Sequence, residues 1–186
     1  MVTGFDPARP EDSDTGHLLA ALGQPITPDE VARISPRRFA AALAPDLAAQ
    51  REGRTLDFDT LVEFSRNAVR NHAGTLLIEG IGGIMVPLDD RHTVLDWMSA
   101  LNVPLVLVAG SYLGSISHTL SCLDVLRRRA LAVRVVVVNE TRGSTVTVAE
   151  TIESVSRFAQ TIAVAGLPWL AARSEGREIE NISLYL

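Results

Sequence analysis

The chain lacks lysine altogether, since all 17 of its basic residues are arginine. It therefore contains no loop of the form G-x-x-x-x-G-K-[ST], whose lysine contacts the phosphates of a bound nucleotide. Cysteine occurs once, at Cys122, which excludes an internal disulfide and a cysteine-based zinc site. No apolar run reaches the ~18 residues needed to cross a bilayer, and residues 1–14 do not resemble a signal peptide. We therefore expect a soluble, cytoplasmic protein without a membrane partner.

Composition and charge narrow the class of protein. Its 186 residues, 47% of them hydrophobic, suffice for one good-sized domain, which we expect to span residues 1–186. The net charge of −5 argues against a nucleic-acid partner, because binding to a phosphate backbone needs clustered cations. The one basic cluster, residues 127–129, falls where a helix should end, and there it complements the helix dipole.

Short, continuously apolar runs in the second half of the chain predict strands buried on both faces, as in a parallel sheet. The predicted strands cover residues 75–79, 104–109, 133–139 and 161–164, and helical patterns at residues 93–101, 115–129 and 146–159 separate them. This alternation predicts an α/β fold with three layers, a mostly parallel sheet and right-handed crossovers. Ligands of such sheets bind beyond the carboxyl ends of the strands.

The first half of the chain indicates helices joined by turns. We expect a loop over residues 1–13, a short helix over residues 14–22 and a turn-rich segment over residues 25–36. An alanine-rich helix is predicted over residues 39–50, and Asp57 is expected to cap a longer helix that runs to about Asn71.

Two acidic residues could bind a metal ion. Glu79 ends an apolar run and is followed at once by Gly80, Gly82 and Gly83, which would let the backbone approach a phosphate closely. A carboxylate in that place could hold Mg²⁺, and Asp14 could supply a second one. The alternatives are a solvated acid in an ordinary turn for Glu79 and a helix cap for Ser13 or Asp14.

Polar residues also follow the two later strands. Ser115 and Ser117 open a helix, where free N–H groups could bind an anion, although simple capping by Ser115 explains the same pattern. Asn139 ends the next strand and could read the edge of a nucleobase. His118 falls just inside the helix, and the other three histidines have no metal-ligand spacing.

These motifs together resemble the dethiobiotin synthase family, the ATP-dependent carboxylases of biotin biosynthesis. The resemblance covers residues 2–186 and rests on "VTGFDP", "IEGIGGIMVPLDD", "VPLVLVAGSYLGSISHTL", "VVVVNET" and "GLPWL". It implies a single-domain P-loop-type fold that works as a homodimer. It also implies a reaction that joins CO₂ to 7,8-diaminononanoate and closes a ureido ring while ATP is cleaved.

The resemblance also implies roles for individual residues. Asp14 and Glu79 match the acids that hold Mg²⁺, and Thr3 matches a hydroxyl residue near the diamine. Gly80, Gly82 and Gly83 match the loop beside ATP, and Asn139 and Pro168 match the site of the base. A helix start in the family receives the carboxylate tail of a substrate bound to the neighbouring subunit. The residues that match it here are Gly114, Ser115, Ile116 and Ser117. Ser117 replaces the asparagine that is usual in the family.

One departure from the family is large. Its members begin with a strand, a P-loop ending in Gly-Lys-Thr, a helix and a lysine-bearing strand, all before the region that matches Val2. This first β-α-β portion is absent from the 186 residues, and no catalytic residue can be assigned without its lysines. We expect either a dethiobiotin synthase whose start lies upstream, or a non-catalytic relative that acts as a binding domain. A cobyrinate amidation enzyme or a partition-type ATPase is a further alternative.

Overall fold

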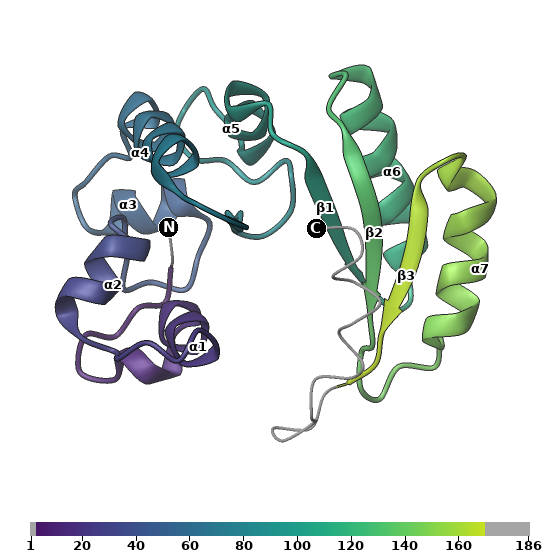
Figure 1. Cartoon of the computed structure of the whole chain (residues 1–186), viewed down its shortest axis with the longest axis horizontal. Helices are drawn as coiled ribbons and strands as arrows, with labels where there is room; N and C mark the ends of the chain where they lie inside the picture. Colours follow the sequence, from purple (N-terminus) through teal and green to yellow (C-terminus); the bar gives the residue numbers. More distant parts are fainter. Residues whose placement is uncertain (1–2, 170–186) are drawn as a thin grey trace. The chain divides into compact units, whose positions relative to one another are not determined.

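A computed structural model describes residues 3–169 of the chain (Figure 1). It divides into two compact units, unit 1 ending at Leu101 and unit 2 beginning at Asn102. The expectation of one domain over residues 1–186 stays a prediction. In the described residues, no helix is both long and apolar enough to pass through a membrane.

Unit 2 is built on a parallel sheet of three strands in the order β1-β2-β3. The strands are β1 (Leu105–Gly110), β2 (Val133–Asn139) and β3 (Ala163–Leu167). In the register of the sheet, Asn139 pairs with Gly110 on one side and with Leu167 on the other. All three strands therefore end in line at one edge, and the α/β class with a parallel sheet is confirmed.

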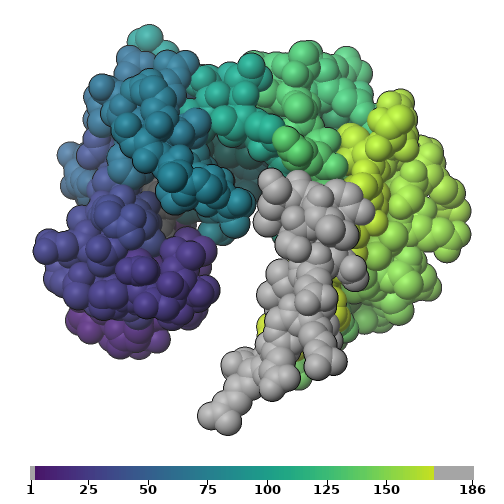
Figure 2. Space-filling model, in the orientation of Figure 1, coloured from purple at the N-terminus to yellow at the C-terminus, as the bar shows by residue number. Residues whose placement is uncertain are grey.

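Two helices, α6 (Ser115–Arg128) and α7 (Val148–Ala159), form the crossovers between the strands and cover one face of the sheet (Figure 1). Every second residue of β2 faces them, so Val136 and Val138 pack against Leu123 of α6 and Val155 of α7. The outer face of α7 lies on the molecular surface (Figure 2). The predicted position of the helix end is confirmed, because α6 stops at Arg128. The Arg127 guanidinium donates to the carbonyl of Ala159, the last residue of α7, at 3.0 Å.

Unit 1 is helical and surrounds its own apolar cluster. Its elements are η1 (Pro10–Asp12), α1 (Asp14–Ala21), α2 (Pro28–Ile34), α3 (Pro45–Arg51), α4 (Phe58–Asn71) and α5 (Val94–Leu101). The core contains Phe39, Leu61, Leu88 and Trp97. The Trp97 indole N–H donates to the Ser65 hydroxyl at 3.1 Å, which satisfies the one polar atom of this buried ring.

Most of the predicted helices are confirmed, but two predictions about the helical segments of unit 1 are wrong. Residues 25–36 hold α2, because Thr27 accepts a hydrogen bond from the Glu30 N–H and Pro28 occupies the first turn, where its missing N–H costs nothing. The alanine-rich helix begins only at Pro45, since proline is suited to a helix start and not to an interior. The Asp57 cap of α4 is confirmed.

The strand predicted over residues 75–79 is also wrong. This segment has no regular secondary structure and pairs with no strand within residues 3–169. A strand exists only through hydrogen bonds to a neighbour, so an apolar run alone does not make one. Leu77 consequently remains exposed. The other predicted strands are confirmed, although the last one begins and ends two to three residues later than expected.

A matched pair of valines tests the packing of the sheet. Val136 is 0% exposed and Val108 is 64% exposed, and both lie within the ladder of unit 2. Val136→Ala should lower the free energy of unfolding by about 2 kcal/mol more than Val108→Ala, because both lose the same strand propensity and only Val136 loses buried methyl groups. Urea unfolding followed by circular dichroism measures the difference. Equal losses for the two variants would contradict the described core.

Candidate functional site

The predicted site residues fall into two groups, all of them within the described chain. Unit 1 holds Thr3, Asp14, Glu79, Gly80, Gly82 and Gly83, whereas unit 2 holds Gly114, Ser115, Ile116, Ser117, Asn139 and Pro168. Each group is built below from its own unit.

Asp14 and Glu79 lie close enough in unit 1 to repel each other. Ser13 caps α1 by accepting from the Gly16 N–H at 3.1 Å, so the capping role belongs to Ser13 and the Asp14 carboxylate stays exposed in the first turn. Although Glu79 is also surface-exposed, the protein atoms around its carboxylate, followed by the negative charge of Asp14, raise its pKa above the usual value. Such a pair favours binding of a cation between the two groups.

No larger metal cluster surrounds this pair. Across residues 3–169, no three side chains of His, Cys, Asp or Glu are arranged to hold a metal ion. A two-carboxylate arrangement nevertheless suits Mg²⁺, which keeps several waters and takes one or two protein carboxylates together with substrate phosphates.

The glycine segment after Glu79 is a turn fixed against α5. Gly82 has a φ of +64°, and a Cβ there would also come within 2.8 Å of Val86, so only glycine fits this position. Two hydrogen bonds hold the residues that follow the turn against the start of α5. The Leu95 N–H donates to the Ile84 carbonyl at 2.7 Å, and the Val94 N–H donates to the Val86 carbonyl at 3.0 Å. The backbone next to the carboxylate pair is thus defined rather than loose.

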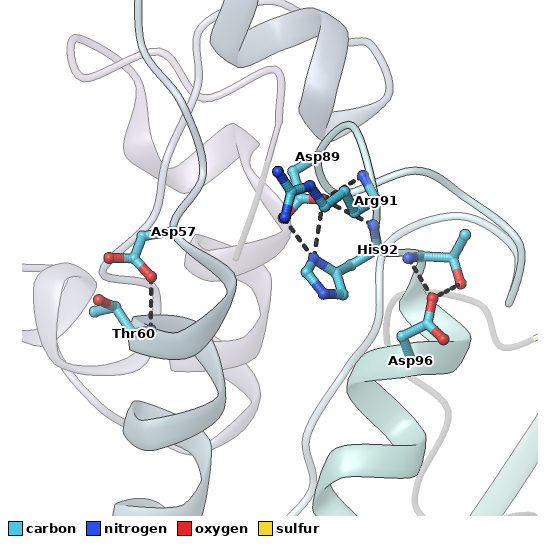
Figure 3. A network of polar contacts seen from close by, with 7 residues as sticks. Asp57, Thr60, Asp89, Arg91, His92 and Asp96 are labelled. Atoms are coloured by element: carbon cyan, nitrogen blue, oxygen red, sulfur yellow. Dashed lines mark hydrogen bonds and ion pairs between the residues drawn. The ribbon is translucent and has the colours of Figure 1, made fainter.

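Asp89 and His92 hold the far end of this segment, a role that the sequence analysis missed. The Asp89 carboxylate accepts from the backbone N–H groups of Arg91 at 2.8 Å and His92 at 2.7 Å, and it lies 2.9 Å from Nδ1 of the His92 ring (Figure 3). That ring stacks on Phe58 at 3.9 Å between centroids, at the start of α4. The spacing of Asp89 and His92 was visible in sequence, but the stacking partner lies 34 residues away.

Thr3 lies in the chain segment that runs beside residues 39–41. The neighbouring Gly4 and Phe5 donate backbone hydrogen bonds to Ala41 at 3.1 Å and Phe39 at 2.9 Å. This pairing fixes the backbone around Thr3, which is itself half-buried.

The start of α6 differs from the expected cap. Gly114, with a φ of +97°, is the residue that precedes the helix, and no side chain caps it, so capping by Ser115 is wrong. The Ser115 hydroxyl is fully buried and lacks a hydrogen-bond partner in the part of the chain described here. The N–H groups of Ile116 and Ser117 likewise have no protein acceptor within residues 3–169. This helix start therefore presents unused donors, which suits an anion.

A pocket of about 460 Å³ opens at the carboxyl edge of the sheet in unit 2. Its wall combines polar groups with small apolar side chains, from Ser111, Glu140, Ser144, Val146, Thr147, Val148, Ala149, Gly166 and Pro168. Pro168, which was predicted to lie in the loop over the base, is one of these wall residues, and its role stays a prediction. Asn139 ends β2 directly before Glu140 but does not line the pocket itself.

Comparisons with known proteins show the family. The family described as AAA domain matches residues 5–176. The ATP-dependent dethiobiotin synthetase BioD of Acidiphilium cryptum is 48% identical over 158 residues, which are 84% of this chain and 71% of the relative. The protein of the same name from Phenylobacterium zucineum is 45% identical over 178 residues, or 95% of this chain and 74% of the relative.

The chain belongs to the dethiobiotin synthetase family. A more distant member, from Anaeromyxobacter sp. (strain K), is 37% identical over 139 residues. The family resemblance inferred from the sequence motifs is thereby confirmed, and at the level of the family the enzyme class is an ATP-dependent ligase. The roles of single residues in the family's reaction remain predictions.

The Asp89–His92 contact gives a test by pH. Partial burial opposes ionisation of Asp89, but the hydrogen bonds from the His92 ring and from the Arg91 and His92 N–H groups outweigh it and lower its pKa from 3.8. The carboxylate therefore stabilises the fold at pH values above 3.8, and the contribution is lost as the pH falls through the lower folded pKa. At pH 7, Asp89→Asn should have a lower urea midpoint of unfolding than the unsubstituted protein. The difference between the two midpoints should shrink in strong acid.

Asp90→Asn is the matched control for that experiment, because Asp90 is the exposed neighbour. Its urea midpoint should equal that of the unsubstituted chain at both pH values. An Asp89→Asn deficit that stayed constant down to strong acid would show that ionisation of Asp89 is not its cause.

Proposed function

We propose that this chain is a dethiobiotin synthase, which carboxylates 7,8-diaminononanoate with CO₂ and closes the ureido ring at the expense of ATP. The observation that carries the proposal is the mutually repelling pair Asp14 and Glu79 beside the fixed turn at Gly82. Membership of the dethiobiotin synthetase family supports the same assignment. Mg²⁺ and ATP are the expected cofactor and co-substrate.

In this proposal Asp14 and Glu79 would hold Mg²⁺, which would supply positive charge to neutralise the phosphate oxygens of ATP. Gly80, Gly82 and Gly83 give the nucleotide and the diamine close access to the backbone, and Thr3 offers a hydroxyl group near the diamine. The raised pKa of Glu79 fits this role, because a cation relieves both its partial burial and its repulsion from Asp14.

The reaction proceeds in three steps. One amine of the diamine attacks CO₂ and loses a proton, which gives a carbamate. An oxygen of the carbamate then attacks the γ-phosphorus of ATP, and ADP leaves. Finally, the second amine attacks the carbamate carbon, the C–O bond to phosphate breaks, and the ring closes with release of inorganic phosphate and a proton. The protein acts mainly by positioning and by charge neutralisation.

Unit 2 would supply the nucleobase site and the site for the tail of the diamine. The 460 Å³ pocket beside Pro168 is polar and apolar in turn, as a base and a ribose require, and Asn139 adjoins it with a donor and an acceptor. In the segment Gly114, Ser115, Ile116 and Ser117, the free N–H groups of Ile116 and Ser117 would donate to a carboxylate. In the family this carboxylate belongs to a substrate in the neighbouring subunit, so the proposal includes a homodimer.

The absence of lysine from the sequence favours a second candidate function, that of a non-catalytic binding domain. The 186 residues contain no lysine and no Gly-Lys-Thr motif. A chain that acts without those groups would bind nucleotide weakly or not at all, and would serve as a binding domain. Turnover of 7,8-diaminononanoate, CO₂ and ATP to dethiobiotin separates the two candidates.

Glu79→Gln tests the metal site through stability as well as turnover. Because the folded pKa of Glu79 is raised above 4.5, its ionisation costs stability above that pH, so the variant should have the higher melting temperature near pH 7 without metal. Millimolar MgCl₂ should stabilise the unsubstituted protein and leave Glu79→Gln unchanged. Turnover should fall by at least about 100-fold, because the charge that holds the ion is lost.

Glu63→Gln serves as the control, since Glu63 is an exposed acid of α4 in the same unit. It should keep turnover, melting temperature and response to MgCl₂. An identical stabilisation by MgCl₂ in all three proteins would remove Glu79 from the metal site.

The proposed homodimer can be tested at Leu113, which is 88% exposed directly before the start of α6. Because a buried aspartate without a partner is costly, Leu113→Asp should shift the protein toward the 20.0 kDa monomer in sedimentation equilibrium. Leu22→Asp, at another exposed leucine, should leave the dimer intact. A monomeric unsubstituted protein, or a dimer unaffected by Leu113→Asp, would contradict this interface.

A further inference from the structure

The loops that follow the three strands of unit 2 are tied to one another in a row. Ser111, after β1, and Thr141, after β2, exchange two bonds: the Ser111 N–H donates to the Thr141 hydroxyl at 3.2 Å, and the Thr141 N–H donates to the Ser111 hydroxyl at 2.9 Å. Ser111 is fully buried. The first two loops of the pocket rim are thus fixed to each other by side chains that the sheet itself aligns.

Glu140 ties the second loop to the third at two points. Its backbone N–H donates to the Leu167 carbonyl at 2.8 Å, and its carboxylate accepts from the Trp169 N–H at 2.7 Å. Pro168 lies between these two contacts and has no N–H of its own. Glu140 therefore provides the backbone bonds on both sides of Pro168, a residue of the pocket wall.

Arg142 holds the same tryptophan from its ring. The guanidinium carbon of Arg142 lies 5.3 Å from the centroid of the Trp169 ring, a distance at which a cation and an aromatic ring attract each other. Glu140 and Arg142 lie two residues apart in one loop. This loop therefore contacts both the backbone N–H and the side chain of Trp169. Trp169 is 54% exposed as a residue, so burial contributes little to holding its ring in place.

We propose that Glu140 and Arg142 are positioning residues of the base pocket, which hold the turn from Leu167 to Trp169 as its wall. Glu140 sets the place of Pro168 by hydrogen bonding, and Arg142 sets the place of the Trp169 ring by stacking. We call these two contacts of Glu140 and Arg142 with residues 167–169 the clamp. The affinity for the nucleotide base depends on the clamp, whereas the chemistry at the phosphates does not. The assignment of the pocket to a nucleotide base rests on the proposed function.

Tryptophan fluorescence reports the clamp directly. The chain contains two tryptophans, and Trp97 is 4% exposed and hydrogen-bonded in the core of unit 1. Quenching by acrylamide therefore reports mainly Trp169, and Trp169→Phe verifies that assignment. In the protein without nucleotide, Glu140→Ala and Arg142→Gln should each increase the quenching constant. Glu140→Gln should not, because its amide oxygen can still accept from the Trp169 N–H.

Nucleotide binding tests the consequence of the clamp. Glu140→Ala should weaken the binding of ATP and of adenosine by about tenfold, the effect expected for loss of one charge-assisted hydrogen bond, and raise the KM for ATP with kcat within about twofold. Glu140→Gln should stay within about threefold in affinity. Glu153→Ala, at an exposed acid of α7, is the control and should match the unsubstituted chain.

The outcomes are distinct. Unchanged quenching in Glu140→Ala overturns the clamp, and increased quenching with unchanged affinity for ATP and adenosine overturns its link to the pocket. If the unsubstituted protein binds neither ligand, the proposed function fails at this pocket and the link fails with it, while the quenching comparison still decides whether Glu140 holds Trp169. Increased quenching, weaker binding and recovery in Glu140→Gln together support the proposal.

Discussion

The parallel hydrogen-bonded ladder of β1, β2 and β3 is the constraint on which unit 2 depends. Its register aligns Gly110, Asn139 and Leu167, so three loops that are distant in sequence must leave the sheet at one edge. Once the loops start side by side, short polar side chains suffice to tie them, as Ser111 and Thr141 do. The pocket is a consequence of that alignment, and Gly166 in its wall lets Val148 and Ile152 of α7 pack directly against β3.

Unit 1 places its polar groups by a different principle, since it has no sheet to align them. Asp14 stands at a helix start that Ser13 has already capped, and Glu79 ends a segment that pairs with no strand in the described chain. The segment that follows Glu79 is anchored to α5 by backbone hydrogen bonds, and Asp89 fixes its far end. The negative charge of Asp14 helps to raise the pKa of Glu79, an effect that a bound cation would reverse.

Sequence reasoning succeeded where the local pattern and the tertiary environment agree. The apolar run at residues 133–139 gave the bounds of β2 without error, because Val135 to Val138 are buried on both faces of the sheet and the polar Arg134 and Asn139 fall near its ends. The same reasoning failed at residues 75–79, where the pattern is equally apolar and the neighbour is lacking among the described strands. It also failed at α2, although the Thr27 cap and Pro28 were legible as a helix start.

By itself, the sequence determined the α/β class, the family and the residue types available for chemistry, because these follow from local periodicity and from motifs that are contiguous in the chain. Only the tertiary structure decided which of those residues meet. The contact of Glu140 with Trp169 joins residues 29 positions apart, and the stacking of Phe58 on His92 joins two separate segments. Such contacts depend on strand register and helix packing, which no local pattern encodes.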